Sequence, residues 1–177
     1  RVLRRARLDQ DADASVASLL RERAREAPDE VAFLFAGRAY SLAEADARVD
    51  ELVRALVERG VGPGQRVPVV ARATPDAITA LVALDRIGAS AEPIAHVDRR
   101  AWLKAGYDVA IEHRLTSADT VYAPSTLAAD GVALAVAAAL VGGARLQLGR
   151  SEPNWQELMN SGATIVLADD ETARTLA

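Results

Sequence analysis

The chain has 177 residues, a formal net charge of −4 and a pI near 5.3, and half of its residues are hydrophobic. This length suffices for one domain or two small lobes, and the acidic balance argues against a general nucleic-acid-binding role. The sequence contains no cysteine, which excludes disulfides, a thiolate nucleophile and cysteine-based metal sites.

The remaining composition narrows the class of protein further. His96 and His113 do not have metal-ligand spacing, so we expect no metal site. We interpret His113 as a solvated side chain at a helix end, with a proton carrier as the alternative. The sequence has no signal peptide and no run of 18 apolar residues, so we expect a cytoplasmic protein.

The first elements alternate helix, hairpin and helix. Ser15 is a candidate cap for a helix that continues to Ala27, and Pro28 stops it. Residues 31–36 form a short apolar run that returns as a hairpin through Gly37 and Arg38. The capping-box spacing of residues 41 and 44 then opens a long amphipathic helix, which ends at a glycine, Gly60.

The next segment predicts a β-α-β unit. Residues 67–71 are continuously apolar, which predicts a fully buried strand. Thr74 and Pro75 are a cap and a first helical residue, and Gly88 closes the helix that they begin. Residues 89–94 form the following strand. This order, with short connections, implies a parallel sheet covered by helices.

The second half repeats the alternation. We expect strands at residues 120–123, 145–148 and 164–168, and helices at 102–111, 130–141 and 153–160. The fold class is therefore α/β, with one or more mostly parallel sheets flanked by helices. We expect a basic tail over residues 1–11, a first lobe over 12–95, a seam over 96–113 and a second lobe over 114–177. The two lobes can also pack as one domain.

Several segments occur in the order and spacing of a known superfamily. Residues 40–45 (YSLAEA) resemble its (T/S)-Y-x-E-L segment, and residues 60–67 (GVGPGQRV) resemble G-V-x-P-G-D-R-V, with Gln65 replacing Asp. Residues 87–94 resemble K-A-G-A-x-x-x-P-(I/L). Residues 115–121, 140–146 and 162–166 resemble later family segments more loosely. The chain thus resembles the amino-terminal region of adenylate-forming enzymes, the acyl-CoA synthetases and peptide-synthetase adenylation domains.

One family segment is missing between Pro93 and Leu115. There the family carries tens of residues that include a Ser/Thr/Gly-rich loop ending in Pro-Lys-Gly, which binds the phosphates of ATP. The space between Pro93 and Leu115 is too short for that loop. The chain also stops before the family's Tyr-Gly-x-Thr-Glu motif and its carboxy-terminal lysine. We therefore expect a truncated version of the family's amino-terminal domain.

The resemblance implies an activity that joins a carboxylate to AMP, with ATP, magnesium and either CoA or a phosphopantetheine carrier. Because the loop is missing, we expect a truncated or degenerate relative, a pseudoenzyme without catalytic residues or a cofactor of its own. It would act as a structural or partner-binding module in a biosynthetic assembly. The alternative is the amino-terminal portion of an active acyl-CoA ligase or adenylation domain whose remaining parts lie outside this chain. Expected partners are a carrier protein, a synthetase domain or a complementary ligase fragment, and neither nucleic acid nor a membrane.

Asp130 and Gly131 are the candidate substrate-binding residues. The resemblance puts Asp130 where peptide-synthetase adenylation domains pair an aspartate with the substrate's α-amino group, and puts Gly131 on a glycine of the acyl-CoA synthetase pattern. Capping of the following helix is the competing interpretation of Asp130. We interpret Lys104, the chain's one lysine, as a helix-surface residue rather than a phosphate ligand. We interpret the acidic run at residues 169–171 as the start of a last helix rather than a cation site.

Overall fold

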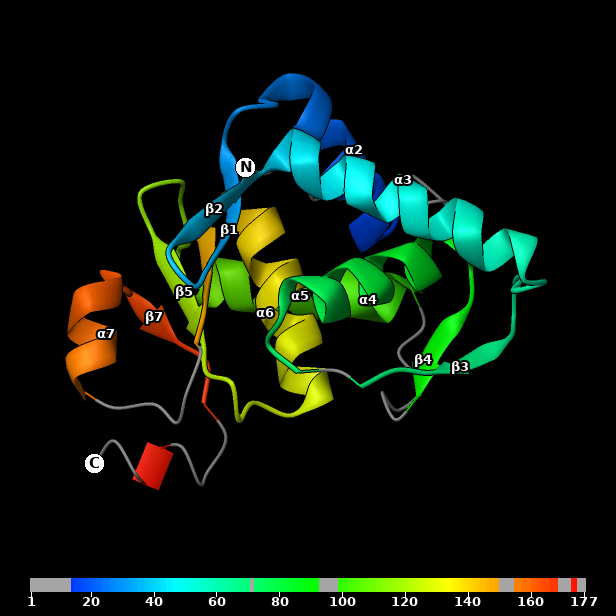
Figure 1. Ribbon diagram of the computed structural model, residues 1–177. Coiled ribbons are helices and arrows are strands. Elements are labelled where there is room, and N and C mark those ends of the chain that lie inside the picture. The colour runs from blue at the N-terminus through cyan, green and yellow to red at the C-terminus, as the bar shows by residue number, and fades with distance from the viewer. Residues whose placement is uncertain (1–13, 71, 93–98, 150–154, 169–172, 175–177) are drawn as a thin grey trace.

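The computed structural model describes residues 14–70, 72–92, 99–149, 155–168 and 173–174. Helices and strands alternate along most of this chain (Figure 1). The helices are α2 (Val16–Glu26), α3 (Leu42–Glu58), α4 (Pro75–Ile87), α5 (Arg99–Glu112), α6 (Ala129–Gly142) and α7 (Trp155–Ser161). The strands are β1 (Val31–Phe35), β2 (Arg38–Ser41), β3 (Arg66–Pro68), β4 (Ser90–Glu92), β5 (Thr120–Ala123), β6 (Arg145–Leu148) and β7 (Ile165–Val166).

Five strands form the main sheet, in the order β2-β1-β6-β5-β7. All neighbours are parallel except the β1–β2 hairpin. Both expected lobes contribute strands to this sheet, because β1 from the first pairs with β6 from the second. Helix α6 lies on one side of the sheet and α7 on the other (Figure 1). The expected α/β class with a mostly parallel sheet is confirmed.

Local caps set the ends of the helices. Ser15 caps α2 through a full capping box with Ser18. Ser41 Oγ accepts a hydrogen bond from the Glu44 amide at the start of α3, while the Glu44 carboxylate pairs with Arg38. Thr74 caps α4. Gly88 closes α4 with a φ of 82°, a left-handed conformation that glycine adopts without a Cβ clash.

The core lies between the main sheet and α6, whose residues are nearly all alanine, valine and leucine. The small side chains let α5 approach closely, since a Cβ added at Gly106 would lie 2.6 Å from the Ala137 Cβ. Trp102 Nε1 donates a 2.7 Å hydrogen bond to the Ala133 carbonyl and so joins the same two helices. Helix α5 thus occupies residues 99–112 of the expected seam and packs tightly on α6.

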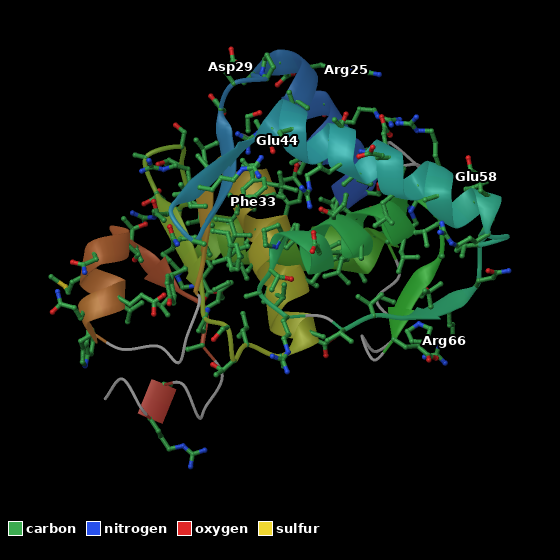
Figure 2. The ribbon with its side chains drawn as sticks, viewed as in Figure 1. Arg25, Asp29, Phe33, Glu44, Glu58 and Arg66 are labelled. Carbon is green, nitrogen blue, oxygen red and sulfur yellow. The ribbon has the colours of Figure 1, made fainter. Side chains whose placement is uncertain are left out.

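Aromatic residues fill the other end of the core. Phe33 and Tyr40 stack across the hairpin with ring centroids 4.6 Å apart. Figure 2 shows Phe33 inside the molecule, while Glu58 and Arg66 extend outward from α3 and β3. Three of the chain's seven aromatic residues, Phe33, Phe35 and Tyr40, thus belong to the edge hairpin.

The prediction of a buried strand over residues 67–71 is wrong. The strand there, β3, covers Arg66–Pro68 and pairs only with β4 in a separate two-stranded sheet. Pro68 is exposed and the Val70 side chain is 80% exposed. An apolar run predicts full burial only where other layers cover both faces of its sheet, and here Val67 is half-buried while Pro68 and Val70 are exposed.

Candidate functional site at the carboxyl edge of the sheet

The carboxyl ends of β1, β6, β5 and β7 meet at one edge, because these strands are parallel. The connection after β5 leads to α6, and the connection after β6 leads toward α7 on the opposite face (Figure 1). Adjacent strands whose connections diverge in this way form a topological switch point, where open α/β sheets bind ligands. The switch point between β5 and β6 is therefore the candidate site.

Asp130 lies at this edge, in the first turn of α6. Its side chain is exposed and forms no ion pair within the part of the chain that the structure describes. Ala128, not Asp130, is the N-cap of α6, and no side chain caps this helix. The capping interpretation of Asp130 is wrong, since the helix starts one residue earlier than expected and places Asp130 in its first turn, where a negative charge favours the helix dipole.

Gly131 fits against the loop that precedes the helix. A Cβ there would lie 2.7 Å from the Leu127 side chain, which is buried. Leu127 in turn closes a turn by donating its amide to the Pro124 carbonyl at 3.0 Å. Gly131 thus lets Leu127 anchor the loop between β5 and α6. The substrate-binding role of Asp130 and Gly131 remains a prediction.

Tyr122 and Gly149 pack together where β5 and β6 end. Tyr122 is fully buried, and its hydroxyl has no hydrogen-bond partner among the described residues. Burial, with a smaller contribution from the Glu157 carboxylate, raises the Tyr122 pKa far above its usual range. A Cβ at Gly149 would lie 2.5 Å from the Tyr122 hydroxyl, so only glycine fits there. Tyr122 therefore stays a neutral phenol and is unsuited to act as a base.

Among the described residues, neither phosphate ligands nor metal ligands gather at this edge. Lys104 is exposed on α5 and pairs with Asp108 at 2.6 Å, one turn away. This pair is a surface i,i+4 contact, as the interpretation of Lys104 predicts. Among the described residues, no three His, Asp or Glu side chains form a group able to hold a metal ion. His113 is exposed just after α5. The acidic run at residues 169–171, His96 and the basic tail lie outside the described residues.

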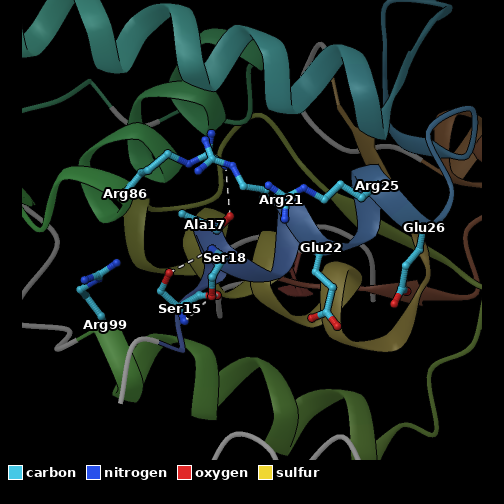
Figure 3. A pocket seen from close by; sticks show the side chains of 9 residues that line it. All are labelled: Ser15, Ala17, Ser18, Arg21, Glu22, Arg25, Glu26, Arg86 and Arg99. Carbon is cyan, nitrogen blue, oxygen red and sulfur yellow. Dashed lines mark hydrogen bonds between the residues drawn. The ribbon is translucent and has the colours of Figure 1, made fainter. Parts of the chain in front are cut away.

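A second feature, which the sequence does not predict, is a cavity of about 500 Å³ beside α2 (Figure 3). Arginines line it from α2, α4 and α5, together with Glu22 and Glu26. Arg86 bonds to Asp46 and Asp50, and Arg21 also pairs with Asp50. Since carboxylates already neutralise these two cations, the cavity does not provide a cluster of free positive charge for a phosphate group.

Asp85 and Arg86 bind the first turn of α2, which lines this cavity. Asp85 Oδ2 accepts a 2.8 Å hydrogen bond from the Ala17 amide, and Arg86 donates to the Ala17 carbonyl at 3.1 Å. Arg99, the first residue of α5, pairs with the other Asp85 oxygen at 3.3 Å. Burial raises the Asp85 pKa, although the Ala17 amide and Arg99 counteract this. We call these residues the Asp85 junction, and it joins α2, α4 and α5.

Comparison with known proteins gives a match to one family model and a shared fold. Residues 20–101 match the family model described as AMP-binding enzyme. Malpibaldin synthetase from Mortierella alpina is 33% identical over 82 residues, which are 45% of this chain and 2% of that protein. Tyrocidine synthase 3 from Brevibacillus parabrevis is 27% identical over 82 residues, 46% of this chain and 1% of that protein. The chain therefore corresponds to a very small part of these curated relatives.

Solved structures share the fold over most of the chain. The N-terminal subdomain of NpsA from Klebsiella oxytoca matches with a TM-score of 0.71 and 15% identity, over 86% of this chain and 59% of that one. The o-succinylbenzoate CoA synthetase of Bacillus subtilis, in complex with its acyl-adenylate intermediate, matches with a TM-score of 0.73 and 12% identity, over 89% and 63%. At these identities the likeness establishes the fold. Within the described residues, no helix combines the length and the hydropathy that crossing a membrane requires.

Proposed function

We propose that this chain, which has the fold of the amino-terminal region of adenylate-forming enzymes, acts as a structural or partner-binding module that cannot adenylate a carboxylate alone. The observation that carries the proposal is the connection from β4 to β5. In the sequence it contains no Ser/Thr/Gly-rich loop, and its one lysine, Lys104, is engaged with Asp108 on the surface of α5.

The physical reason is the charge of the triphosphate. Transfer of an adenylyl group requires amide donors and cations around the phosphates, because negative charge must be stabilised as pyrophosphate leaves. The described residues offer neither a glycine-rich cradle nor an unpaired lysine at the carboxyl edge. A chain that keeps this fold without these groups is better suited to bind a partner through its surface than to catalyse the reaction.

The proposed setting is a multidomain synthetase. The curated relatives are synthetases of which this chain spans 1–2%, and one structural neighbour is an adenylation domain fused to a carrier domain. A carrier protein, another synthetase domain or a complementary ligase fragment is therefore the proposed partner.

ATP–pyrophosphate exchange tests the proposal. The purified chain, shown to be folded by circular dichroism, is assayed with magnesium, ATP and a panel of amino, aryl and acyl acids, with an intact adenylation domain as positive control. We expect exchange equal to the protein-free blank and no ATP-dependent shift in melting temperature. Exchange above the blank, or saturable ATP binding, would refute the proposal.

Asp130 favours a second candidate, in which the chain is the substrate-binding portion of an active ligase completed by other polypeptide. The observation is an exposed carboxylate without an ion pair at the switch point. Such a carboxylate is suited to bind the α-amino group of an amino acid. Amino-acid binding measured by calorimetry is expected to disappear in Asp130→Asn and to persist in Glu51→Gln, a control on the exposed surface of α3. Binding that Asp130→Asn leaves unchanged, or that Glu51→Gln weakens equally, would exclude Asp130 from this role.

A further inference from the structure

We propose that α2 is a releasable helix, held on α3, α4 and α5 by a network of charged side chains, and that ionisation of Asp85 controls its release. The network consists of three carboxylates and three guanidinium groups. We call it the α2 charge network, and its members are Asp46, Asp50, Asp85, Arg21, Arg86 and Arg99. It acts through the fold alone and is independent of the proposed function.

Helix α2 buries few large apolar side chains. Five of its 11 residues are buried, and one of these is the charged Arg23. Val16 and Leu20 are larger than alanine, and the remaining two are alanines. In α4, by comparison, nine of 13 residues are buried, and four of them are leucine, isoleucine or valine. Because apolar burial is the main favourable contribution to packing, α2 depends on polar contacts more than α4 does.

Those polar contacts begin in the first turn of α2. The Ala17 amide donates to Asp85 at 2.8 Å, and the Ala17 carbonyl accepts from Arg86 at 3.1 Å (Figure 3). One turn later, Arg21 pairs with Asp50 on α3. Each of these contacts joins α2 to a different helix, so they are lost together when α2 leaves its place.

Arg86 is the centre of the network. Its guanidinium pairs with Asp46 at 2.5 Å and with Asp50 at 2.7 Å, and its side chain is only 11% exposed. Asp50 is therefore shared between Arg86 and Arg21. Removing the Asp50 carboxylate would take one partner from each of these arginines, and would weaken the attachment of α2 to α3.

Asp85 is the most buried member, since its side chain is 3% exposed. Among the described residues its one ion-pair partner is Arg99, at 3.3 Å. The groups around it come from four helices: the Ala17 amide and the Ser15 hydroxyl of α2, Arg99 of α5, Arg86 beside it on α4, and Asp46 and Asp50 of α3, which pair with Arg86. Release of α2 would uncover this carboxylate, and water solvates its charged form better than a buried site does.

Ionised Asp85 therefore favours release of α2, and protonated Asp85 favours docking. The raised pKa of Asp85, which burial causes, has the same sign. Docking is then strongest below pH 3.8, the ordinary pKa of the group, and weakens as the pH rises through the raised pKa. A released helix of this length is marginal in water, so its amides would lose their hydrogen bonds and exchange with solvent.

Native-state hydrogen exchange of the 177-residue protein tests the proposal, with α2 amides compared with those of α6. In the parent we expect α2 amides to open roughly a hundredfold more often than those of α6, because α2 leaves without global unfolding. After correction for the chemical exchange rate at each pH, the opening of α2 is expected to increase as the pH rises above 3.8. In Asp85→Asn this dependence should be absent.

Asp50→Asn tests the network separately from Asp85. We expect it to increase the opening of α2 roughly tenfold, as breaking two partly exposed ion pairs should. Asp108→Asn is the matched control, because it removes the partner of Lys104 in a pair on the exposed surface of α5. It is expected to leave the opening of α2 unchanged.

Three results would overturn the proposal. The first is exchange of α2 amides at the rate of α6 amides, which would mean that α2 leaves only when the whole chain unfolds. The second is a pH dependence that Asp85→Asn retains. The third is an effect of Asp50→Asn no larger than that of Asp108→Asn. The comparison of α2 with α6 uses the parent protein, so it decides the first point even if a variant does not fold.

Discussion

Gly106 allows α5 to lie against the backbone of α6, and Gly106→Ala tests how much of the fold depends on that approach. In a solvated helix the change is expected to stabilise by about 1 kcal/mol. Here the new Cβ would lie 2.6 Å from the Ala137 Cβ and 2.7 Å from its carbonyl carbon. Backbone atoms of α6 cannot rotate away, so the helices must separate, at a typical overpacking cost of about 1–3 kcal/mol. We expect a net loss of roughly 1–2 kcal/mol.

Urea denaturation followed by circular dichroism measures this loss. Gly131→Ala is the matched control, because the three atoms nearest its Cβ belong to the Leu127 side chain, at 2.7 Å and beyond, and none of them is backbone. The control is expected to lose less stability than Gly106→Ala or to gain some. A Gly106→Ala protein as stable as the parent would show that α5 and α6 are packed less tightly than described.

Further variants test the junction and the candidate site. Because the Asp85 pKa is raised, the folded protein binds a proton at this carboxylate more readily than the unfolded protein does. The stabilisation that results from protonated Asp85 is fully present below pH 3.8, the ordinary pKa of the group, and is lost as the pH rises through the raised pKa. Asp85→Asn should therefore gain stability relative to the parent as pH rises above 3.8, and a difference independent of pH would contradict this. Gly149→Ala is expected to lose about 1–3 kcal/mol in chemical denaturation, and a simultaneous Tyr122→Phe, which removes the clashing hydroxyl, should recover part of it. Trp102→Phe is expected to lose about 1 kcal/mol with its hydrogen bond to Ala133, and thermal melting of the variant checks this.

Local signals predicted the main sheet well. The strands at residues 120–123 and 145–148 have the predicted bounds. Gly143, in a left-handed conformation, ends α6 shortly before the second of them. Thr74 and Gly88 likewise delimit α4 as predicted. These features depend on neighbours within a few residues, which is the range that a sequence pattern reports.

Features that depend on distant residues were not predictable. The Asp85 junction joins the Asp85 carboxylate to the backbone amide of Ala17, 68 residues earlier in the sequence. Arg23 is buried and donates to the carbonyl of Leu140, 117 residues later, at 3.1 Å. The exposure of Val70 depends on the separation of β3 and β4 from the main sheet, which the apolar run does not report. For Asp130, the sequence pattern predicted a place at the start of a helix. It did not predict that the residue lies inside the first turn of α6 rather than at its cap.

The pairing of β1 with β6 has a consequence for biosynthesis. Phe33 is the register partner of Leu146, about 110 residues later in the chain. At translation rates of about 5–20 residues per second, the hairpin leaves the ribosome roughly 5–20 seconds before its partner strand exists. During that interval Phe33 and its neighbours on β1 have no parallel strand to pair with, and the nascent chain is exposed to aggregation. Synonymous codons that slow translation between β2 and β6 should therefore reduce soluble yield without altering the mature protein.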